Sequence, residues 1–403
     1  MSLVEDVPPP PGEEPAPDAS FRVGPIITIS AGHAAHDTFI GFVPVLLPSF
    51  VERFGLSNTK AGALSAFTQL PSLLQPVFGH LADRLALRWM VTLAPGVTAT
   101  LMSLTGWAPG YAVLALLLTT AGISSAAFHA VASATAGRLS VRHLGRGLSL
   151  WMVGGELGSA VGPLLAAGAL ALLTLKGLAW LMILGWAASL ALHVQLRRVP
   201  PGFGQVERPH WRLALGRMRR VMGIVGALAV LRGMALSAPW TFGPILLQDE
   251  GHGNLASGAA LTLYLTAGMV GTLGAGWLSD RLGRRVILLG GTLAGPSALL
   301  LFIAVGGWTR FIFLALAGSA TVALHPVCMA LVQEAFPESR GLANALYLST
   351  VFIISSVAAV AVGALGDAIG LRSAFVISGA VTFLSLPLIF LLPADGRAGR
   401  QRT

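Results

Sequence analysis

Long apolar stretches dominate this chain, and charged residues, glycine and proline mark where each stretch ends. Most of them are long enough for the ~20 residues with which a helix crosses a bilayer. None has the strict apolar–polar alternation of a membrane β-barrel strand. The pattern predicts an all-α polytopic membrane protein with twelve transmembrane helices, at residues 23–50, 59–83, 88–108, 111–138, 145–172, 176–196, 218–248, 255–280, 285–306, 309–334, 339–367 and 371–393.

The composition agrees with this class. Of the 403 residues, 54% are hydrophobic and only 11% are charged, whereas soluble domains carry roughly 25% charged residues. A sequence pI of 11.0 would also fit a nucleic-acid-binding protein, but the basic residues are dispersed between apolar stretches, as membrane topology requires. We therefore expect the lipid bilayer as a partner and no nucleic acid. Cys328 is the only cysteine, so the fold cannot depend on an internal disulfide.

The positions of Lys and Arg predict the orientation of the chain. With the N-terminus inside, 20 of the 26 basic residues fall in or beside inner connections, five fall in or beside outer ones, and Arg232 lies within a predicted helix. This bias indicates that both termini are cytoplasmic and that the number of helices is even. We expect a multi-pass protein of the plasma membrane, which in a bacterium is the cytoplasmic membrane.

The longest connection divides the chain into two sets of six predicted helices. It is basic and contains three prolines. The proline-rich, acidic N-terminal segment lacks the basic and apolar regions of a signal peptide, so we expect it to be a disordered cytoplasmic tail. The predicted organisation is a tail at 1–21, a six-helix bundle at 22–196, a cytoplasmic linker at 197–217, a second six-helix bundle at 218–393 and a cytoplasmic tail at 394–403.

The two bundles repeat one another in sequence. Gly79-His-Leu-Ala-Asp83-Arg84 is echoed by Gly276-Trp-Leu-Ser-Asp280-Arg281, and His129 is echoed by His325, at offsets of 197 and 196 residues. A near-constant offset indicates a duplicated six-helix unit. Parallel repeats about an axis along the membrane normal are typical of the two halves of a major-facilitator transporter.

Individual motifs also resemble the major facilitator superfamily. The second copy of the repeat, which continues through Gly283 and Arg284, looks like the signature cytoplasmic loop of that superfamily, whereas the first copy departs from it after Arg84. Gly158-Ser-Ala-Val-Gly162-Pro163 resembles a fifth-helix motif associated with antiporters. Within the superfamily, the chain looks most like the fosmidomycin-resistance-type exporters, through His33-Ala-Ala-His36-Asp37, Phe67–Pro76, Arg146-Gly147, Gly154-Gly155 and His325–Glu334. It departs from that branch at Glu156 and Ala130, where an amide and a proline are more usual.

His33 and Asp37 carry the first candidate chemistry. They lie four residues apart, so they share one face of a helix near mid-membrane. Ionisable groups at that depth are costly and mark functional sites by default, and groups that exchange protons can couple transport to a proton gradient. The alternative is a hydrogen-bonded cluster that only pins the first helix. Glu156, also near mid-membrane, is the third proton-coupling candidate, and its alternative is a protonated Glu that bridges two helices.

The resemblance supplies a geometry for further polar residues. In this superfamily the first, fourth, seventh and tenth helices line a central cavity, which implies a shared site for residues on those four helices. The predicted substrate-cavity residues are His36, His129, Arg232, His325 and Gln69. Each has a structural alternative: a satisfied histidine, a snorkelling arginine, or a glutamine that joins two helices.

The repeated Gly-x-x-x-Asp-Arg sequence predicts a cytoplasmic gate. The resemblance implies that Asp83 and Asp280 pair with Arg or accept from a helix N-terminus and so hold one conformation closed. The candidate gate residues are Gly79, Asp83, Arg84, Gly276, Asp280, Arg281, Gly283 and Arg284.

Taken with the resemblance, these features predict a secondary active transporter that works by alternating access and is not an enzyme. We expect a monomer without a cofactor that exports a small organic compound or drug in exchange for protons. The sequence has no phosphate-binding loop, and His33-Ala-Ala-His36 lacks further ligands at zinc-site spacing, so neither ATP hydrolysis nor a metal is expected. Two alternatives stay open: an uptake symporter or uniporter for a small polar or anionic nutrient, and a membrane sensor that does not transport.

Overall fold

The computed structural model describes residues 23–84, 88–140, 144–197, 211–336 and 340–392, and these residues are almost entirely helical, with no strand among them. The predicted tails at 1–21 and 394–403 and most of the predicted linker lie outside the described residues. Helices satisfy their backbone hydrogen bonds internally, which the bilayer core requires. The predicted all-α class is confirmed.

The N-terminal half consists of eight α-helices joined by short 3₁₀ segments. The α-helices are α1 (Val23–Ile40), α2 (Val43–Phe54), α3 (Asn58–Gln69), α4 (Gln75–Arg84), α5 (Arg88–Ser103), α6 (Tyr111–Leu139), α7 (Leu144–Gly177) and α8 (Met182–Leu196). The 3₁₀ segments are η1 (Leu70–Leu74), η2 (Leu104–Trp107) and η4 (Leu178–Leu181).

The C-terminal half repeats this arrangement. Its α-helices are α9 (Trp211–Ser237), α10 (Gly243–Asp249), α11 (Asn254–Leu282), α12 (Arg284–Ala304), α13 (Arg310–Val322), α14 (Leu324–Ala335), α15 (Arg340–Ile369), α16 (Leu371–Thr382) and α17 (Leu386–Phe390). A π-helical turn, η5 (Ala238–Phe242), joins α9 to α10, and the 3₁₀ segment η7 (Phe383–Ser385) joins α16 to α17.

Several membrane crossings are broken into shorter helices, and the breaks have local causes. Pro71 lies at the start of η1 and Pro239 at the start of η5, where a missing N–H weakens the α-helical ladder. Nine helical stretches are long and apolar enough to cross a membrane on their own. The longest, Gly147–Leu196, contains two crossings that meet at Thr174, whose φ is 66°. The nine stretches therefore provide ten crossings. The consecutive helices α3 and α4 form one more and α5 another, so the described residues form the twelve predicted crossings.

The last part of the predicted linker is helical. The linker was predicted to run to residue 217, and α9 begins at Trp211. Leu213, Ala214 and Leu215 follow the last proline of the connection and are strong helix formers. The helix therefore continues beyond the apolar stretch from which the boundary was predicted.

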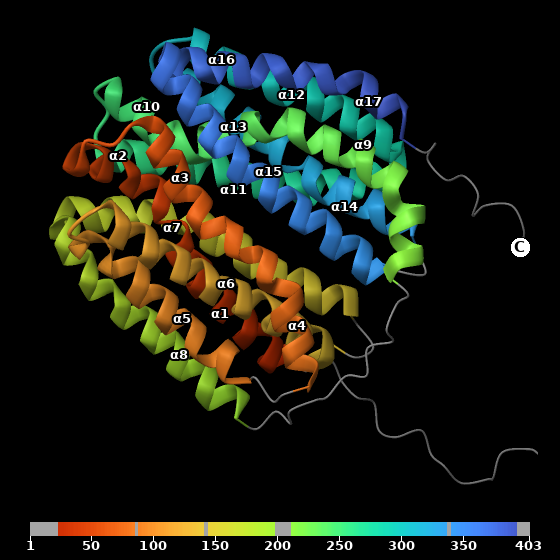
Figure 1. Ribbon diagram of the computed structural model, residues 1–403, viewed down its shortest axis with the longest axis horizontal. Coiled ribbons are helices and arrows are strands. Elements are labelled where there is room, and N and C mark those ends of the chain that lie inside the picture. Colours follow the sequence, from red (N-terminus) through yellow and green to blue (C-terminus); the bar gives the residue numbers. More distant parts are fainter. Residues whose placement is uncertain (1–22, 85–87, 141–143, 198–210, 337–339, 393–403) are drawn as a thin grey trace, which may run out of the picture.

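The first and last helix ends of both halves lie at the same end of the bundle. The start of α1, the end of α8, the start of α9 and the end of α17 lie together at one end, which we call the termini end, and the opposite end is the far end (Figure 1). At the far end α3 packs against α15, α2 against α10 and α7 against α11. One buried core there includes Phe42 and Leu46 of the N-terminal half and Leu246 and Tyr264 of the C-terminal half.

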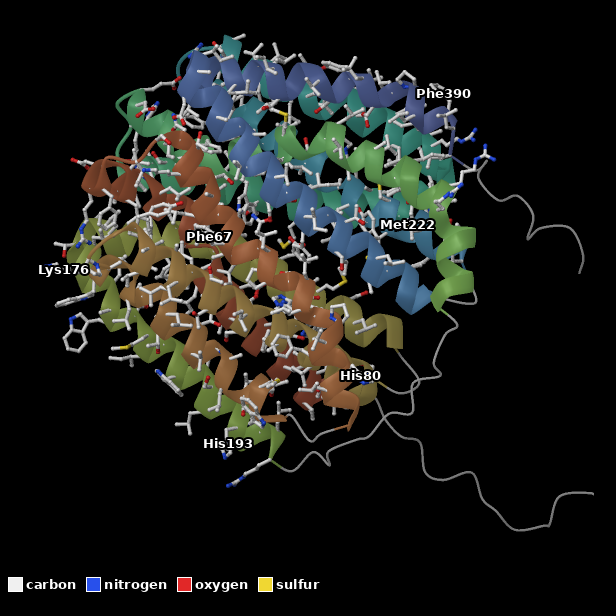
Figure 2. All side chains as sticks on the ribbon, viewed as in Figure 1. Phe67, His80, Lys176, His193, Met222 and Phe390 are labelled. Atoms are coloured by element: carbon white, nitrogen blue, oxygen red, sulfur yellow. The ribbon has the colours of Figure 1, made fainter. Side chains whose placement is uncertain are left out.

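Toward the termini end each half has a core of its own. One is built from N-terminal residues such as Phe128 and Leu192, and the other from C-terminal residues such as Leu331 and Tyr347. His80 of α4 and Met222 of α9 lie toward this end on different halves, whereas Lys176 lies at the far end (Figure 2). Packing between the halves is therefore concentrated at the far end.

Candidate functional site

Direct backbone contact between α1 and α7 fixes the position of the site. Three glycines recur at every fourth residue along α7, and a Cβ on any of them would meet a backbone carbonyl of α1. The pairs are Gly154 with Ser30, Gly158 with Ala34, and Gly162 with Thr38. Small residues at this spacing allow close approach of membrane helices. The predicted antiporter-type residues Gly158 and Gly162 thus lie in this helix contact, and the carbonyl of the adjacent Pro163 lies against Gly258 of α11 in the other half.

Gly155 provides the space for the ionisable side chains. A Cβ at this position would overlap the imidazole ring of His33 and come within 3.0 Å of an Asp37 carboxylate oxygen. Both groups therefore fit between α1 and α7 only because residue 155 has no side chain.

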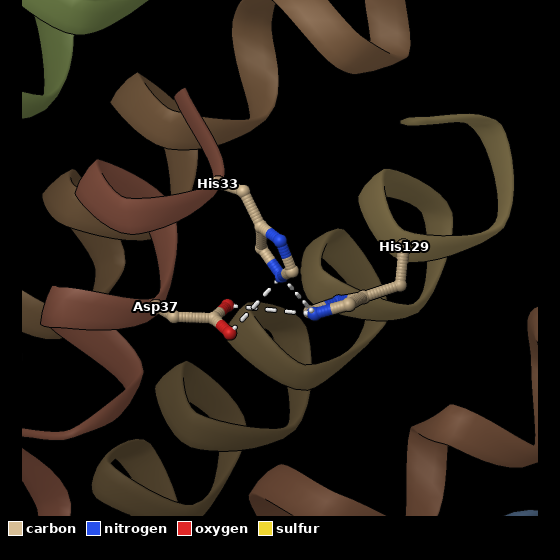
Figure 3. A group of neighbouring side chains, drawn as sticks. All are labelled: His33, Asp37 and His129. Carbon is tan, nitrogen blue, oxygen red and sulfur yellow. Dashed lines mark hydrogen bonds and ion pairs between the residues drawn. The ribbon is translucent and has the colours of Figure 1, made fainter. Parts of the chain in front are cut away.

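His33, Asp37 and His129 form a compact triad (Figure 3). His33 Nε2 lies 3.2 Å from Asp37 Oδ2, one helical turn away on α1. His129 reaches in from α6, with its Nε2 3.5 Å from Asp37 Oδ1 and 3.1 Å from His33 Nε2. The His33 side chain is 5% exposed, that of Asp37 14% and that of His129 25%. The prediction that His33 and Asp37 share a helix face agrees with this geometry, and the structure adds His129 to them.

The remaining ring nitrogens fix the tautomers of both histidines. His33 Nδ1 lies 2.8 Å from the carbonyl oxygen of Trp151, and His129 Nδ1 lies 2.8 Å from that of Ser125. A carbonyl oxygen only accepts hydrogen bonds, so both Nδ1 atoms donate and carry hydrogen. In neutral histidines both Nε2 atoms then have lone pairs, and these point toward each other and toward the carboxylate.

Aromatic rings enclose the triad. The indole of Trp151 stacks on the His33 ring at a centroid distance of 4.1 Å and an interplanar angle of 18°. Next to Asp37, the ring of His36 stacks on Phe128 at 4.4 Å. His36 is fully buried, and its Nε2 is 4.0 Å from Asp37 Oδ1. His36 therefore lies in the packed wall behind Asp37 in this conformation, although the sequence placed it among the cavity residues.

Glu156 lies beside the triad on α7. Its carboxyl group is partly buried. Glu156 directly follows Gly155, the residue of α7 that lies against His33 and Asp37. Gln69 ends α3 and is half-buried, and among the described residues its side chain makes no hydrogen bond or ion pair.

A second polar cluster lies in the C-terminal half. Arg232 of α9 is 6% exposed, and its guanidinium donates to the carbonyl oxygen of Thr321 at 3.0 Å and to Cys328 Sγ at 3.8 Å. The Tyr347 hydroxyl lies 3.2 Å from both Nδ1 and the carbonyl oxygen of His325. In the described part of the chain, Arg232 makes no ion pair with a carboxylate.

The four-helix convergence implied by the resemblance is only partly present. His33, Asp37 and His129 of the N-terminal half meet, whereas Arg232 and His325 belong to the C-terminal cluster. Within the described ranges no hydrogen bond or ion pair links the two clusters. The halves have separate cores away from the far end, so residues that are equivalent by duplication stay in their own half.

The second copy of the predicted gate forms contacts inside the C-terminal half. Arg284 pairs with Asp280 at 2.6 Å and with Glu334 of α14 at 2.7 Å. Arg281 lies 3.8 Å over the ring of Trp277, and Gly283 has a φ of 97°, which glycine adopts without strain.

The first copy of the gate is described only in part. Asp83 and Arg84 end α4, but their side chains lie outside the described residues. A Cβ at Gly79 or at Gly276 would meet no atom within 4 Å. Neither glycine therefore serves a close helix contact in this conformation, in which the halves meet at the far end.

The triad is also the one group within the described residues whose ligand atoms have the spacing that a metal ion needs. The potential ligand atoms of His33, Asp37 and His129 lie within 4.8 Å of one another. This grouping has no zinc-type spacing along the chain, because His129 comes from another helix. The same convergence of lone pairs also suits a shared proton.

Several neighbours of the site carry no motif of their own. Trp151, Ser125 and Phe128 position the histidines through a ring stack or a backbone carbonyl. A carbonyl acceptor leaves no trace in the residue type, so these roles cannot be read from the sequence. The Gly154-Gly155 pair was the available signal, since adjacent glycines in a membrane helix indicate close contact.

Comparison with known proteins identifies one family and two relatives, and all of them are transporters or are named for drug resistance. A family model described as Major Facilitator Superfamily matches residues 29–255 and 225–403. The chain is 26% identical over 383 residues to the uncharacterised MFS-type transporter YfnC of Bacillus subtilis (strain 168), which covers 92% of this chain and 93% of that protein. It is also 26% identical over 396 residues to the Fosmidomycin resistance protein of Escherichia coli (strain K12), covering 93% of this chain and 94% of that protein.

A solved structure shares the fold. It is a bacterial homologue of the human lysosomal transporter Spinster in an inward-facing and unoccupied conformation, with a TM-score of 0.77 and 15% identity, covering 94% of this chain and 98% of that one. At this identity the likeness concerns the fold alone.

Proposed function

The chain belongs to the major facilitator superfamily, and from that premise we propose that it exports a small organic compound in exchange for protons. The chain is a membrane transporter and not an enzyme, since its family and its fold neighbours are transporters. The finer proposal concerns the direction of transport, the coupling ion and the residues that carry it.

One observation carries the proposal of proton coupling. Both Nδ1 atoms of the triad donate to carbonyl oxygens, so His33 Nε2, His129 Nε2 and the Asp37 carboxylate present three sets of lone pairs to one another at 3.1–3.5 Å. Three acceptors at these distances repel each other unless a cation lies among them. One proton converts one histidine to imidazolium and turns each repulsive contact of that Nε2 into a hydrogen bond or an ion pair.

This shared proton is the one that we propose to be exchanged. Glu156, on the adjoining helix and next to Gly155, which lies against His33 and Asp37, is the proposed second proton-carrying group, through which the triad would gain or lose its proton. His36 is the other titratable group that faces Asp37. The compound would bind in the conformation in which this cluster has released its proton.

We propose that the termini end faces the cytoplasm. The 20-to-5 distribution of basic residues supports this orientation. With the halves packed together at the far end, the conformation is then inward-facing, the state named for the Spinster homologue of the same fold. The α1–α7 glycine contact would hold the proton site in the N-terminal half while the two halves rock about it.

Export is supported by two features. The relative from Escherichia coli is named for resistance to fosmidomycin, and a transporter that removes the compound from the cell would provide such resistance. The Gly158–Pro163 motif resembles that of antiporters. Fosmidomycin is therefore the first compound to test.

The experiment is flux of radiolabelled fosmidomycin in inverted membrane vesicles that contain the overproduced protein. Energised vesicles, which are acidic inside, should accumulate the compound, and a protonophore should abolish the accumulation. Vesicles from cells without the protein are the control. Accumulation in right-side-out vesicles instead would support the uptake alternative, and fluxes insensitive to the protonophore would contradict proton coupling.

A further inference from the structure

A carboxylate of the C-terminal half completes a helix of the N-terminal half. Asp367 lies near the far end of α15, directly opposite the start of α3. Its Oδ1 accepts a hydrogen bond from the backbone N–H of Asn58 at 2.7 Å, and its Oδ2 accepts from the backbone N–H of Thr59 at 2.9 Å and from the Thr59 hydroxyl at 2.5 Å. These contacts cross the interface between the halves.

The start of α3 needs such a partner. The first N–H groups of a helix have no acceptor within the helix and normally receive one from a residue just before it. Here the hydroxyl of the N-cap residue, Ser57, accepts from the backbone N–H of Lys60, at 3.3 Å. The N–H groups of Asn58 and Thr59 are left for Asp367, whose negative charge also suits the positive end of the helix.

The surrounding packing brings the two helices close enough for this contact. Ala359, Gly363 and Asp367 follow one another at four-residue intervals on α15, so they share a face. A Cβ at Gly363 would meet the carbonyl of Asn58, and a Cβ at Gly62 of α3 would meet the carbonyl of Ala359. The carboxylate thus ends a strip of backbone contact between the halves.

We propose that Asp367 is the far-end latch of the transport cycle. It stabilises the conformation in which the far end is closed, and its hydrogen bonds to Asn58 and Thr59 break each time that end opens. Asp367 and Asn58 lie at the exposed edge of the contact, so water replaces the lost partners at modest cost and the latch stays reversible. The proposal rests on the alternating-access function, because only a protein that opens at the far end needs a latch there.

The proposed latch stabilises one conformation and takes no part in binding the compound. Its test therefore measures how often the far end is open, and not only the rate of transport. Ala359 is fully buried on the face of α15 that meets α3. An Ala359→Cys reporter, in a full-length chain whose native Cys328 is replaced by alanine, reacts with a polar maleimide only while the far end is open. The rate of labelling in lipid nanodiscs then follows the population of the open state.

We expect Asp367→Ala to raise the labelling rate about fivefold, the population shift that corresponds to loss of a typical helix N-cap of ~1 kcal/mol. Asp367→Asn, which keeps the shape and loses the charge, should raise it by a smaller factor. Thr59→Ser keeps the hydroxyl and both N–H groups and should leave it unchanged. Asp249→Asn, at another exposed carboxylate of the far end, is the matched control.

Labelling rates in both Asp367 variants equal to that of the Asp249→Asn control would overturn the latch. The reporter needs neither a substrate nor a proton gradient. A raised rate therefore supports the latch even if proton-driven export of fosmidomycin is not found, whereas proton-driven export together with unchanged labelling contradicts the latch alone. Gel filtration and the thermal midpoint of each variant separate opening from unfolding.

Discussion

Asp37→Asn is the sharpest test of proton coupling, because it removes the charge of the triad and keeps its shape. The Asp37 carboxylate lies 3.2 Å from one histidine Nε2 and 3.5 Å from the other. At an effective dielectric constant of ~20, two opposite unit charges at that separation attract by about 5 kcal/mol. The asparagine amide retains a carbonyl dipole, and the 14% exposure of the Asp37 side chain allows some screening, so we take roughly half of that energy as lost.

A loss of ~2.5 kcal/mol lowers the affinity of the triad for the shared proton roughly 70-fold. Accumulation driven by a proton gradient should fall by a similar factor. Exchange of labelled for unlabelled compound across the membrane, which needs no proton transfer, should persist. The two activities are measured side by side in proteoliposomes with fosmidomycin.

Asp249→Asn serves as the control, because this exposed carboxylate lies at the far end on α10, away from the triad. Gradient-driven rates at the wild-type level in Asp37→Asn would refute the assignment of the proton to the triad. Loss of both accumulation and exchange, with the fold intact by gel filtration, would instead place Asp37 in binding of the compound.

Three further outcomes are expected. Gly155→Ala should cost about 1–3 kcal/mol of stability by overpacking and should abolish gradient-driven transport, because its Cβ overlaps His33. Gly168→Ala is the control: it lies inside the same helix, where a Cβ meets no atom within 4 Å, so it should leave transport unchanged and should not lower the thermal midpoint. Glu250→Gln should destabilise the protein by about 2 kcal/mol in denaturant unfolding, since the buried Arg310 loses its ion-pair partner, and a neutral result would mean that water replaces that pair. Chelation of metals with EDTA should leave transport unchanged if a proton occupies the triad, whereas restoration of a lost activity by added zinc would identify a metal instead.

The fold could be predicted from the sequence because the bilayer leaves few choices. Continuous apolar stretches of suitable length admit only helices, and charges between them set the ends. The boundary at Trp211 was missed because the helix extends beyond the apolar stretch that marked it. The breaks at Thr174 and within η5 depend on local backbone geometry, which hydropathy does not report.

The site could be predicted only within one helix. His33 and Asp37 share a face because of their spacing, and this needed no tertiary information. The contribution of His129 requires knowledge that α6 lies beside α1, and the resemblance suggested it together with Arg232 and His325. The structure separates these last two from the triad, because duplication tells which positions are equivalent and not how far apart two equivalent positions lie.

The paired Nδ1 hydrogen bonds of His33 and His129 also have an electrical consequence. With both Nδ1 protons fixed in place, the triad carries no net charge when it holds its shared proton and one negative charge when it does not. An elementary charge moved across a full membrane potential is worth about 2.3 kcal/mol per 100 mV. In the proposed exchange, the membrane potential would therefore exert no force on the proton-loaded triad and would act on the step in which the triad has no shared proton.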